Sequence, residues 1–119
     1  MSDPIATFFA AWQQSDSDTR HATISSTVID SVHYHDPRTP ETITNVNGLV
    51  DYVGMFSANA PGWSAKVIKS DTTADVTRVT VAFGGPGPEG KQMMQHGQYF
   101  IEMEGELISR MIGFVGTGA

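Results

Sequence analysis

The stretch Val32-His33-Tyr34-His35-Asp36-Pro37-Arg38 holds the densest cluster of titratable side chains in the sequence. β-branched and aromatic residues are frequent from Val28 to Asp36, which predicts a strand over 28–36. Pro37 cannot donate a hydrogen bond to a sheet and favours an extended backbone at Asp36, so the strand should end here. A carboxylate at the end of a strand is well placed to face a pocket.

The chain has 119 residues, which fits one domain spanning 1–119 with a single core. Hydrophobic residues make up 39% of it, so a disordered chain is excluded. The formal charge is −6 and the basic residues are scattered, which argues against nucleic acid and membrane surfaces as partners. With no cysteine, disulfides, thiolate metal sites and cysteine nucleophiles are excluded. The amino-terminus lacks the features of a signal peptide, so we expect a cytoplasmic protein.

Apolar spacing on both sides of the opening stretch predicts the other elements. Apolar residues at i, i+3, i+4 and i+7 predict a helix over about 4–14 and another that starts at a capping Asn47 and ends at 59–62. A short helix is expected at about 19–27. The remaining segments are strand-like, with turns at 71–75 and 104–106, and the strands are expected at 63–70, 76–83, 91–103 and 107–114. Early helices followed by late strands predict an α+β fold with helices on one face of an antiparallel sheet.

With these elements in place, the chain resembles the nuclear transport factor 2-like superfamily, which includes SnoaL-like cyclases, ketosteroid isomerase, scytalone dehydratase and limonene epoxide hydrolase. The residues that carry the resemblance are Phe8–Trp12, Asp16, Asp18, Tyr34–Pro37, Asn47–Leu49 and Ile108–Phe114. The resemblance implies a cone in which three helices pack on a strongly curved antiparallel sheet and enclose one pocket. It also implies a homodimer through the outer sheet face. For activity it implies a cofactor-free isomerase, dehydratase or hydrolase, without saying which, because this fold hosts enzymes, binding proteins and scaffolds.

Ketosteroid isomerase gives the closest functional comparison. Its general-base aspartate stands directly before a proline at the end of the first strand, which matches Asp36. Its two oxyanion donors fall on Phe8, which cannot donate a hydrogen bond, and near Gln98, which donates more weakly than an acid. The resemblance therefore implies base chemistry at Asp36 without the oxyanion site of classical steroid isomerisation.

Strand alternation extends this candidate site. If Phe100 points inward, His96 and Gln98 do so too, and inward Ile112 and Phe114 would bring Arg110 with them. Asp36 would then be the base, Arg110 its electrostatic partner, and His96 or Gln98 a donor to the substrate. The expected lining of the pocket is Phe8, Trp12, Tyr34, Tyr52, Phe56, Trp63, Met94, Phe100, Ile112 and Phe114. On the same alternation the outer face would carry Gln95, Tyr99, Ile101 and Met103, and a dimer partner would cover it.

Structural roles for these residues remain open alternatives. Asp36 could only cap the loop after its strand, or form a buried structural ion pair with Arg110. His96 and the tryptophans could belong to the core. His33 and His35 share one side of a strand, but no third ligand is evident, so we expect no metal and no cofactor. The protein as a whole could be a small-molecule enzyme, a non-catalytic binder using the same pocket, or an interaction scaffold.

Overall fold

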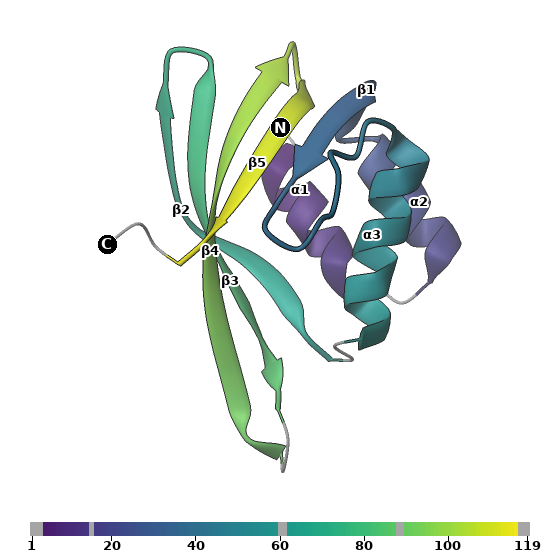
Figure 1. The fold of residues 1–119 in the computed structure, drawn as a ribbon, viewed down its shortest axis with the longest axis vertical. Helices are drawn as coiled ribbons and strands as arrows, with labels where there is room; N and C mark the ends of the chain where they lie inside the picture. The colour runs from purple at the N-terminus through teal and green to yellow at the C-terminus, as the bar shows by residue number, and fades with distance from the viewer. Residues whose placement is uncertain (1–3, 15, 60–61, 88–89, 117–119) are drawn as a thin grey trace.

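The computed structural model describes residues 4–14, 16–59, 62–87 and 90–116. Three helical segments come early in the chain, and five strands form one sheet (Figure 1). The helical elements are α1 (Pro4–Ala10) with its 3-10 extension η1 (Ala11–Gln13), α2 (Ser17–Ser25) and α3 (Val46–Asn59). The strands are β1 (Val28–His35), β2 (Ser64–Thr73), β3 (Val76–Pro86), β4 (Gln92–Glu104) and β5 (Leu107–Val115).

The sheet has the strand order β1-β5-β4-β3-β2. Three of its four pairings are antiparallel, but β1 runs parallel to β5. The sheet is therefore mixed, where a wholly antiparallel sheet was expected. A parallel pair needs a crossover between its strands, and here α3 and the three remaining strands lie between β1 and β5 in the sequence.

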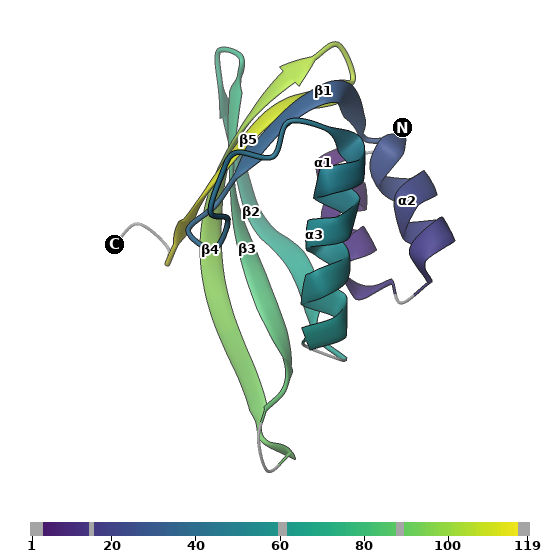
Figure 2. The ribbon, with the colours of Figure 1, turned by 45° about the vertical axis from the view of Figure 1, so that its right-hand side comes forward.

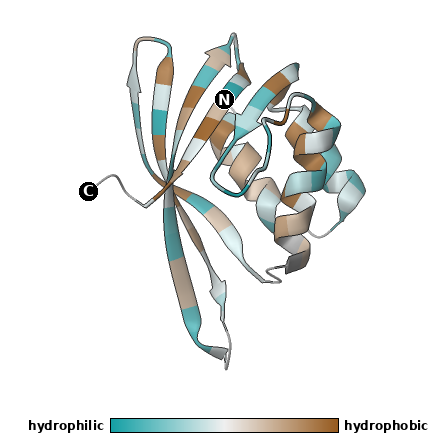
Figure 3. Cartoon of the chain, viewed as in Figure 1, coloured by the Kyte–Doolittle hydropathy of each residue, from teal (hydrophilic) through white to brown (hydrophobic). Residues whose placement is uncertain are grey.

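The helices all lie on one face of the curved sheet, as two views of the chain show (Figures 1 and 2). Apolar and polar residues alternate along the strands (Figure 3), so one face of the sheet is apolar enough to pack against helices. Fully buried side chains from both layers, among them Phe8, Ile24, Leu49, Val81 and Ile101, form the core between them.

Local sequence signals explain most element boundaries. The Asp16 carboxylate caps α2 by accepting from the Thr19 backbone N–H at 2.8 Å. At the start of α3, Asn45 rather than the expected Asn47 supplies the cap, since Asn45 Oδ1 accepts from the Gly48 N–H at 2.7 Å. The turn between β2 and β3 needs only residues 74–75, so β2 runs further than the sequence indicated, while β3 begins where expected and is longer at its other end.

Candidate active site

The Asp36 carboxylate is the centre of a buried hydrogen-bond cluster just beyond the end of β1. Its side chain is only 6% exposed. The Tyr34 hydroxyl donates to Asp36 Oδ2 at 2.6 Å, and the Tyr52 hydroxyl donates to the same oxygen at 2.6 Å. Tyr34 lies two residues before Asp36 in the chain, and Tyr52 comes from α3. Hydrogen bonds to an ionised acceptor are short and about twice as strong as neutral ones.

The second carboxylate oxygen of Asp36 holds the loop that follows β1. Oδ1 accepts from the backbone N–H groups of Arg38 at 2.8 Å and Thr39 at 3.2 Å. The Thr39 hydroxyl accepts from the Asp36 N–H and donates to the Asp36 carbonyl. An ionised carboxylate has about four acceptor positions, and all four have a donor here. The loop-capping alternative therefore describes a real part of what Asp36 does.

Tyr99 on β4 extends the cluster and brings together all three tyrosines of the chain. Its hydroxyl lies 3.2 Å from the Tyr34 hydroxyl. Since the single proton of Tyr34 is directed at Asp36, Tyr99 donates in this contact. A proton chain thus runs from Tyr99 through Tyr34 to Asp36, and Tyr52 reaches the same oxygen independently.

Gly113 on β5 makes room for the Tyr99 ring. A Cβ at position 113 would lie 2.6 Å from Tyr99 Cε2 and 3.0 Å from Asp36 Cβ. Tyr99 and Gly113 are directly paired across β4 and β5. A side chain at 113 would therefore push the tyrosine away from the carboxylate.

All three phenols have a raised pKa and stay protonated at neutral pH. Burial is the largest cause for each of Tyr34, Tyr52 and Tyr99, and the nearby Asp36 charge raises the pKa of each further. The Tyr34 and Tyr52 pKa values are also raised because their protons are donated to Asp36. The cluster therefore consists of one carboxylate and three neutral phenols.

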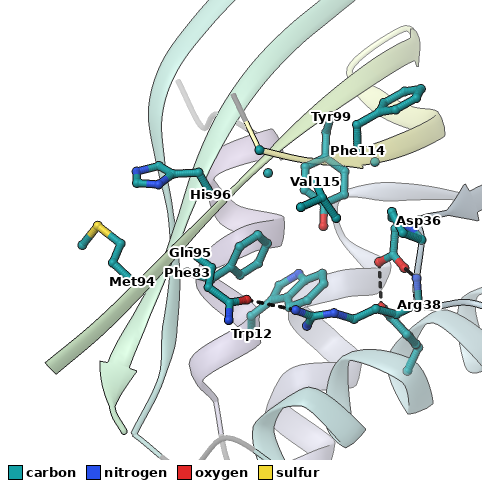
Figure 4. A pocket seen from close by; sticks show the side chains of 15 residues that line it. Trp12, Asp36, Arg38, Phe83, Met94, Gln95, His96, Tyr99, Phe114 and Val115 are labelled. Carbon is teal, nitrogen blue, oxygen red and sulfur yellow. Dashed lines mark hydrogen bonds between the residues drawn. The ribbon is translucent and has the colours of Figure 1, made fainter. Parts of the chain in front are cut away.

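An open cleft of about 520 Å³ lies against this cluster. Trp12, Asp36, Tyr52, Phe83 and Tyr99 are among the residues that line it. In Figure 4, Asp36 and Arg38 lie on the same side of the cleft, and the Gln95 side chain extends from β4 toward Arg38. The size fits a small molecule, and an aromatic wall with a few polar groups is typical of ligand sites.

A second cavity of about 410 Å³ adjoins the first. Arg38, Tyr52, Phe83 and Gln95 line both of them. Arg38 Nη2 donates to Gln95 Oε1 at 3.1 Å, which joins the loop after β1 to β4. The other residues that line the second cavity are Met55, Phe56 and Trp63.

The side chains of β4 and β5 that were expected to point toward the helices lie on the opposite, outer face of the sheet. Tyr99, Ile101 and Met111 are buried against the helices, whereas Phe100 and Phe114 are 38% and 55% exposed. The alternation is therefore shifted by one residue, and the residues that belong to the outer face are His96, Gln98, Phe100, Arg110, Ile112 and Phe114. For the same reason four residues that were expected outside belong to the inner face, namely Gln95, Tyr99, Ile101 and Met103. Both faces carry large apolar residues, so hydrophobicity alone could not choose between them.

Arg110 does not meet Asp36. Arg110 Nη1 forms an ion pair with Glu102 Oε2 at 3.0 Å, between directly paired residues of β4 and β5. Both side chains of this pair are about half exposed. The buried Asp36–Arg110 ion pair and the role of Arg110 as partner of the base are therefore wrong.

His96, Met94 and Phe114 contribute to the rim of the first cavity, but their side chains point away from Asp36 (Figure 4). The Phe114 ring instead packs on Phe100 with 5.6 Å between ring centroids. The nearest polar contact of Gln98 is a long 3.4 Å hydrogen bond to Thr80. Met94 and Phe114 thus line the first cavity, where the sequence placed them, whereas His96 and Gln98 are not assembled with the carboxylate.

The remaining predicted lining residues divide between cleft and core. Trp12 and Tyr52 lie at the first cavity, and Phe56 and Trp63 at the second. Phe8 and Tyr34 are fully buried beneath the cleft. Sequence reasoning missed Arg38, Phe83 and Gln95. Arg38 was within reach, because it is the last residue of the titratable stretch Val32–Arg38.

No group of three or more His, Asp or Glu side chains that could hold a metal ion occurs within the described ranges. His35 Nδ1 instead lies 3.0 Å from the Thr42 hydroxyl. Within the same ranges, no helix is both long and apolar enough to cross a membrane.

The fold has many relatives among solved structures. A SnoaL-like family protein from Agrobacterium tumefaciens strain C58 superposes with a TM-score of 0.80, covering 96% of this chain and 95% of the other at 18% identity. The chain has the ketosteroid isomerase-like fold. A hypothetical protein with that fold from Catenulispora acidiphila, solved in complex with trimethylamine, gives a TM-score of 0.79 at 13% identity and covers 98% and 87% of the two chains.

A third similar structure, from Sinorhizobium meliloti, is described as a proposed polyketide cyclase. It gives a TM-score of 0.70 at 18% identity over 95% of this chain and 94% of the other. No family model and no curated protein matches the sequence. The comparisons therefore establish the three-helix, curved-sheet architecture, while the chemistry must be argued from the residues of the cleft.

Proposed function

We propose that this protein binds a small hydrophobic molecule in the cleft and moves a proton on it without a cofactor, as an isomerase, dehydratase or hydrolase would. One observation carries the proposal: Tyr34 and Tyr52 converge on the buried Asp36 carboxylate at the wall of the cleft, each with a 2.6 Å hydrogen bond. Asp36 is the final proton acceptor. In enzymes of these kinds, the catalytic acid–base groups are commonly buried at the wall of a cleft.

Tyr52 is the group through which Asp36 acts. Its only proton is directed at Asp36 Oδ2, so its oxygen can accept a proton from a ligand in the cleft. As the ligand C–H or O–H bond breaks, its proton forms a bond to Tyr52 Oη, and the former Tyr52 proton passes to Asp36 Oδ2. The ligand keeps the electron pair, and Asp36 becomes a carboxylic acid. The raised pKa of Tyr52 supports this relay, because the phenol is protonated before the step.

Arg110, His96 and Gln98 have no part in this proposal, since their side chains belong to the outer face. Arg38 takes the place of Arg110 as the cation beside the cleft. The phenols of Tyr52 and Tyr99 place polar oxygen atoms at the cleft, which the Phe8 position cannot do. They reach the cleft from α3 and β4 rather than from the first helix.

Hydrogen exchange on ligands tests the proposal without knowledge of the natural substrate. Small cyclic ketones are incubated with the protein in deuterated buffer, and the loss of their α-hydrogens is followed by proton NMR. We expect exchange with wild type and a loss of about 100-fold or more in Asp36→Asn, the usual scale of general-base catalysis. Exchange at the uncatalysed rate for every ketone that binds would contradict the enzymatic proposal.

Two tyrosine variants separate the relay from direct attack by Asp36. Tyr52→Phe removes the group between the ligand and the carboxylate, so exchange should fall nearly as far as in Asp36→Asn. Tyr34→Phe removes an equal hydrogen bond from the same oxygen without changing the cleft wall, so its loss should be smaller. Faster exchange in Tyr52→Phe would show that the freed Asp36 oxygen is itself the base.

A non-catalytic binder is the second candidate. The observation that favours it is the complete set of four donors around Asp36, which leaves no free acceptor position on the carboxylate in this state. A binder would hold ligands unchanged, and its affinity would survive Asp36→Asn because the aromatic walls provide most of the contact. Ligand-induced thermal stabilisation in both proteins, without hydrogen exchange, would establish this alternative.

We also propose a homodimer through the outer face of the sheet. Phe100 and Phe114, which pack on each other there, are partly exposed, and an apolar patch on a sheet is commonly covered by a partner. The residues differ from those first expected, but the face is the same. A scaffold role would use this surface too. The cytoplasmic location remains a prediction.

A further inference from the structure

Two hydrogen-bond donors at the cleft have unused capacity. They are the guanidinium of Arg38 and the indole N–H of Trp12, and both residues line the first cavity. The proposed proton relay uses neither of them. Their shared position indicates what kind of ligand group the cleft would accept.

Arg38 is an exposed cation whose guanidinium makes one hydrogen bond within the described ranges, to Gln95 at 3.1 Å. It has no carboxylate partner among the described residues, whereas Arg78 and Arg110 pair with Asp71 and Glu102. A guanidinium carries five N–H donors in a planar fork that matches a carboxylate. Most of this capacity is free and borders both cavities.

Trp12 provides an independent sign of a missing acceptor. Its side chain is 2% exposed, and its Nε1 has no hydrogen-bond partner in the described part of the chain. The ring is held edge-on by Phe56 and Tyr52, with centroid distances of 5.1 and 6.1 Å. Buried donors without an acceptor are rare in folded proteins, and each one calls for an explanation.

Apart from the Tyr52 oxygen, the side-chain acceptors named at this side of the cleft already have donors. Both oxygens of Asp36 have their donors, and Gln95 Oε1 accepts from Arg38. The cleft therefore offers donors and one positive charge, and a ligand must bring the acceptors. The aromatic side chains around them, including Phe83 and Tyr52, suit a flat ring.

On this basis, which rests on the proposed function of the cleft, we propose that its ligands are small ring-bearing carboxylates. Arg38 would bind the carboxylate, and the buried Trp12 Nε1 would donate to one of its oxygens once the side chains that cover it move aside. Arg38 is thus the residue that determines specificity for an acid. The ligand would replace Gln95 as the acceptor for Arg38. This would break the Arg38–Gln95 hydrogen bond, whose two residues line both cavities.

The charge of the protein makes Arg38 necessary for such a ligand. The formal charge of −6 repels an anion at long range, so a local cation must offset that repulsion. The positive charge of Arg38 reaches the cleft wall, since it lowers the pKa of both Tyr52 and Tyr99 against the larger upward effect of burial. Asp36 adds to that repulsion at the cleft wall, since its charge raises the pKa of the same two phenols.

Matched acid and amide ligands test this inference. Isothermal titration calorimetry at neutral pH compares benzoate with benzamide, naphthoate with naphthamide, and anthracene carboxylate with its amide. Each pair has the same rings and differs in charge. We expect wild type to bind the best acid at least about tenfold more tightly than its amide, the effect of about one charge-assisted hydrogen bond.

Variants assign that preference to Arg38. Arg38→Gln should weaken binding of the acid at least about tenfold and leave the amide unchanged, while Arg38→Lys keeps part of the preference. Arg78→Gln removes the same charge outside the cleft and is the matched control. Trp12→Phe should weaken the acid more than the amide.

The outcomes distinguish the two proposals. Equal affinity for acids and amides, or an acid preference that persists in Arg38→Gln, would overturn the carboxylate inference and leave the small-molecule cleft intact. Binding of neither series would overturn both. Unchanged thermal unfolding of ligand-free Arg38→Gln would confirm that the variant is folded, as expected for an exposed side chain.

Discussion

The Tyr34 phenol and the Asp36 carboxylate are joined by a 2.6 Å hydrogen bond between residues only two apart in the chain. Tyr34 ends up fully buried and Asp36 nearly so. The strand-ending proline at position 37 thus lies next to a carboxylate that helps to hold the fold together as well as facing the cleft. Removal of the Asp36 carboxylate should therefore lower the stability of the fold, whether or not the protein has an activity.

Replacement of Asp36 should therefore destabilise the protein in a graded way. Asp36→Leu leaves two phenols and two backbone N–H groups without their acceptor and should lower the free energy of unfolding by about 3–5 kcal/mol. Asp36→Asn should cost about 1–2 kcal/mol, because its amide oxygen still accepts from the loop and its amide N–H can donate to the phenol oxygens. Urea denaturation measures both.

Asp30→Asn on the exposed side of β1 is the control for the Asp36 series. It removes the same charge from the same strand and should change the stability by less than about 0.5 kcal/mol. An Asp36→Leu protein as stable as this control would mean that the hydrogen bonds around the carboxylate contribute nothing net to folding.

Stability should fall steeply at alkaline pH. The ordinary tyrosine pKa is 10.0, and burial raises that of Tyr34 and Tyr99 well above it in the folded protein. Above about pH 10 the unfolded chain loses phenol protons that the folded chain keeps, so unfolding becomes more favourable by up to about 1.4 kcal/mol per pH unit for each buried tyrosine. Below the unfolded-state pKa this contribution is constant.

Denaturation midpoints from neutral pH upward, with the ultraviolet absorbance of tyrosinate as a second signal, measure the alkaline effect. Tyr34→Phe removes one of the buried phenols and should reduce the slope. Tyrosinate that appears in the still-folded protein near pH 10 would show that the phenols are not held protonated, since that is their ordinary pKa.

Gly113→Ala should damage the cluster without changing any polar group. The added methyl group would lie 2.6 Å from Tyr99 Cε2, so the ring must move away from Tyr34. We expect a loss of about 1–3 kcal/mol, typical of overpacking in a core. A double-mutant cycle with Tyr99→Leu isolates the cause, because the penalty at 113 should shrink once the ring is gone. An additive pair would locate the strain elsewhere.

The outer face of the sheet can be tested by charge. Phe100→Glu together with Phe114→Glu places two acids on the apolar face and should convert the proposed dimer to a monomer. Sedimentation equilibrium measures the mass. Met55→Glu, an exposed apolar position on α3, is the control and should keep the mass of wild type. A monomeric wild type would contradict the proposed dimer directly.

The helices and the order of elements could be predicted because their signals are local. The apolar spacing that begins at Leu49 gives α3, and residues 105–106 give the turn before β5. The parallel pairing of β1 with β5 could not be predicted in the same way. It depends on which edge of the sheet the first strand joins, and no residue of β1 specifies that alone.

At the site, the sequence placed Asp36, Tyr34 and Tyr52 around one pocket, but it put Tyr99, the third tyrosine of the cluster, on the outer face. The inward face of β4 was assigned from Phe100, although its neighbour Tyr99 is the buried residue. A one-residue error in alternation exchanges every side chain of a strand between faces. The glycines at 97 and 113, both buried on the inner face of the sheet, were the available signal, because they leave space for a large ring.

The parallel pairing of β1 with β5 also bears on how the protein folds. It sets Val28 beside Ile108 and Tyr34 beside Met111, and contacts between such distant parts of a chain form slowly. Asp36 follows β1, while Gly113, over which Tyr99 lies, belongs to β5. The full cluster, with Tyr99 packed over Gly113, is therefore expected to form only after the last strand has docked, so recovery of the cleft during refolding should lag behind formation of the helices.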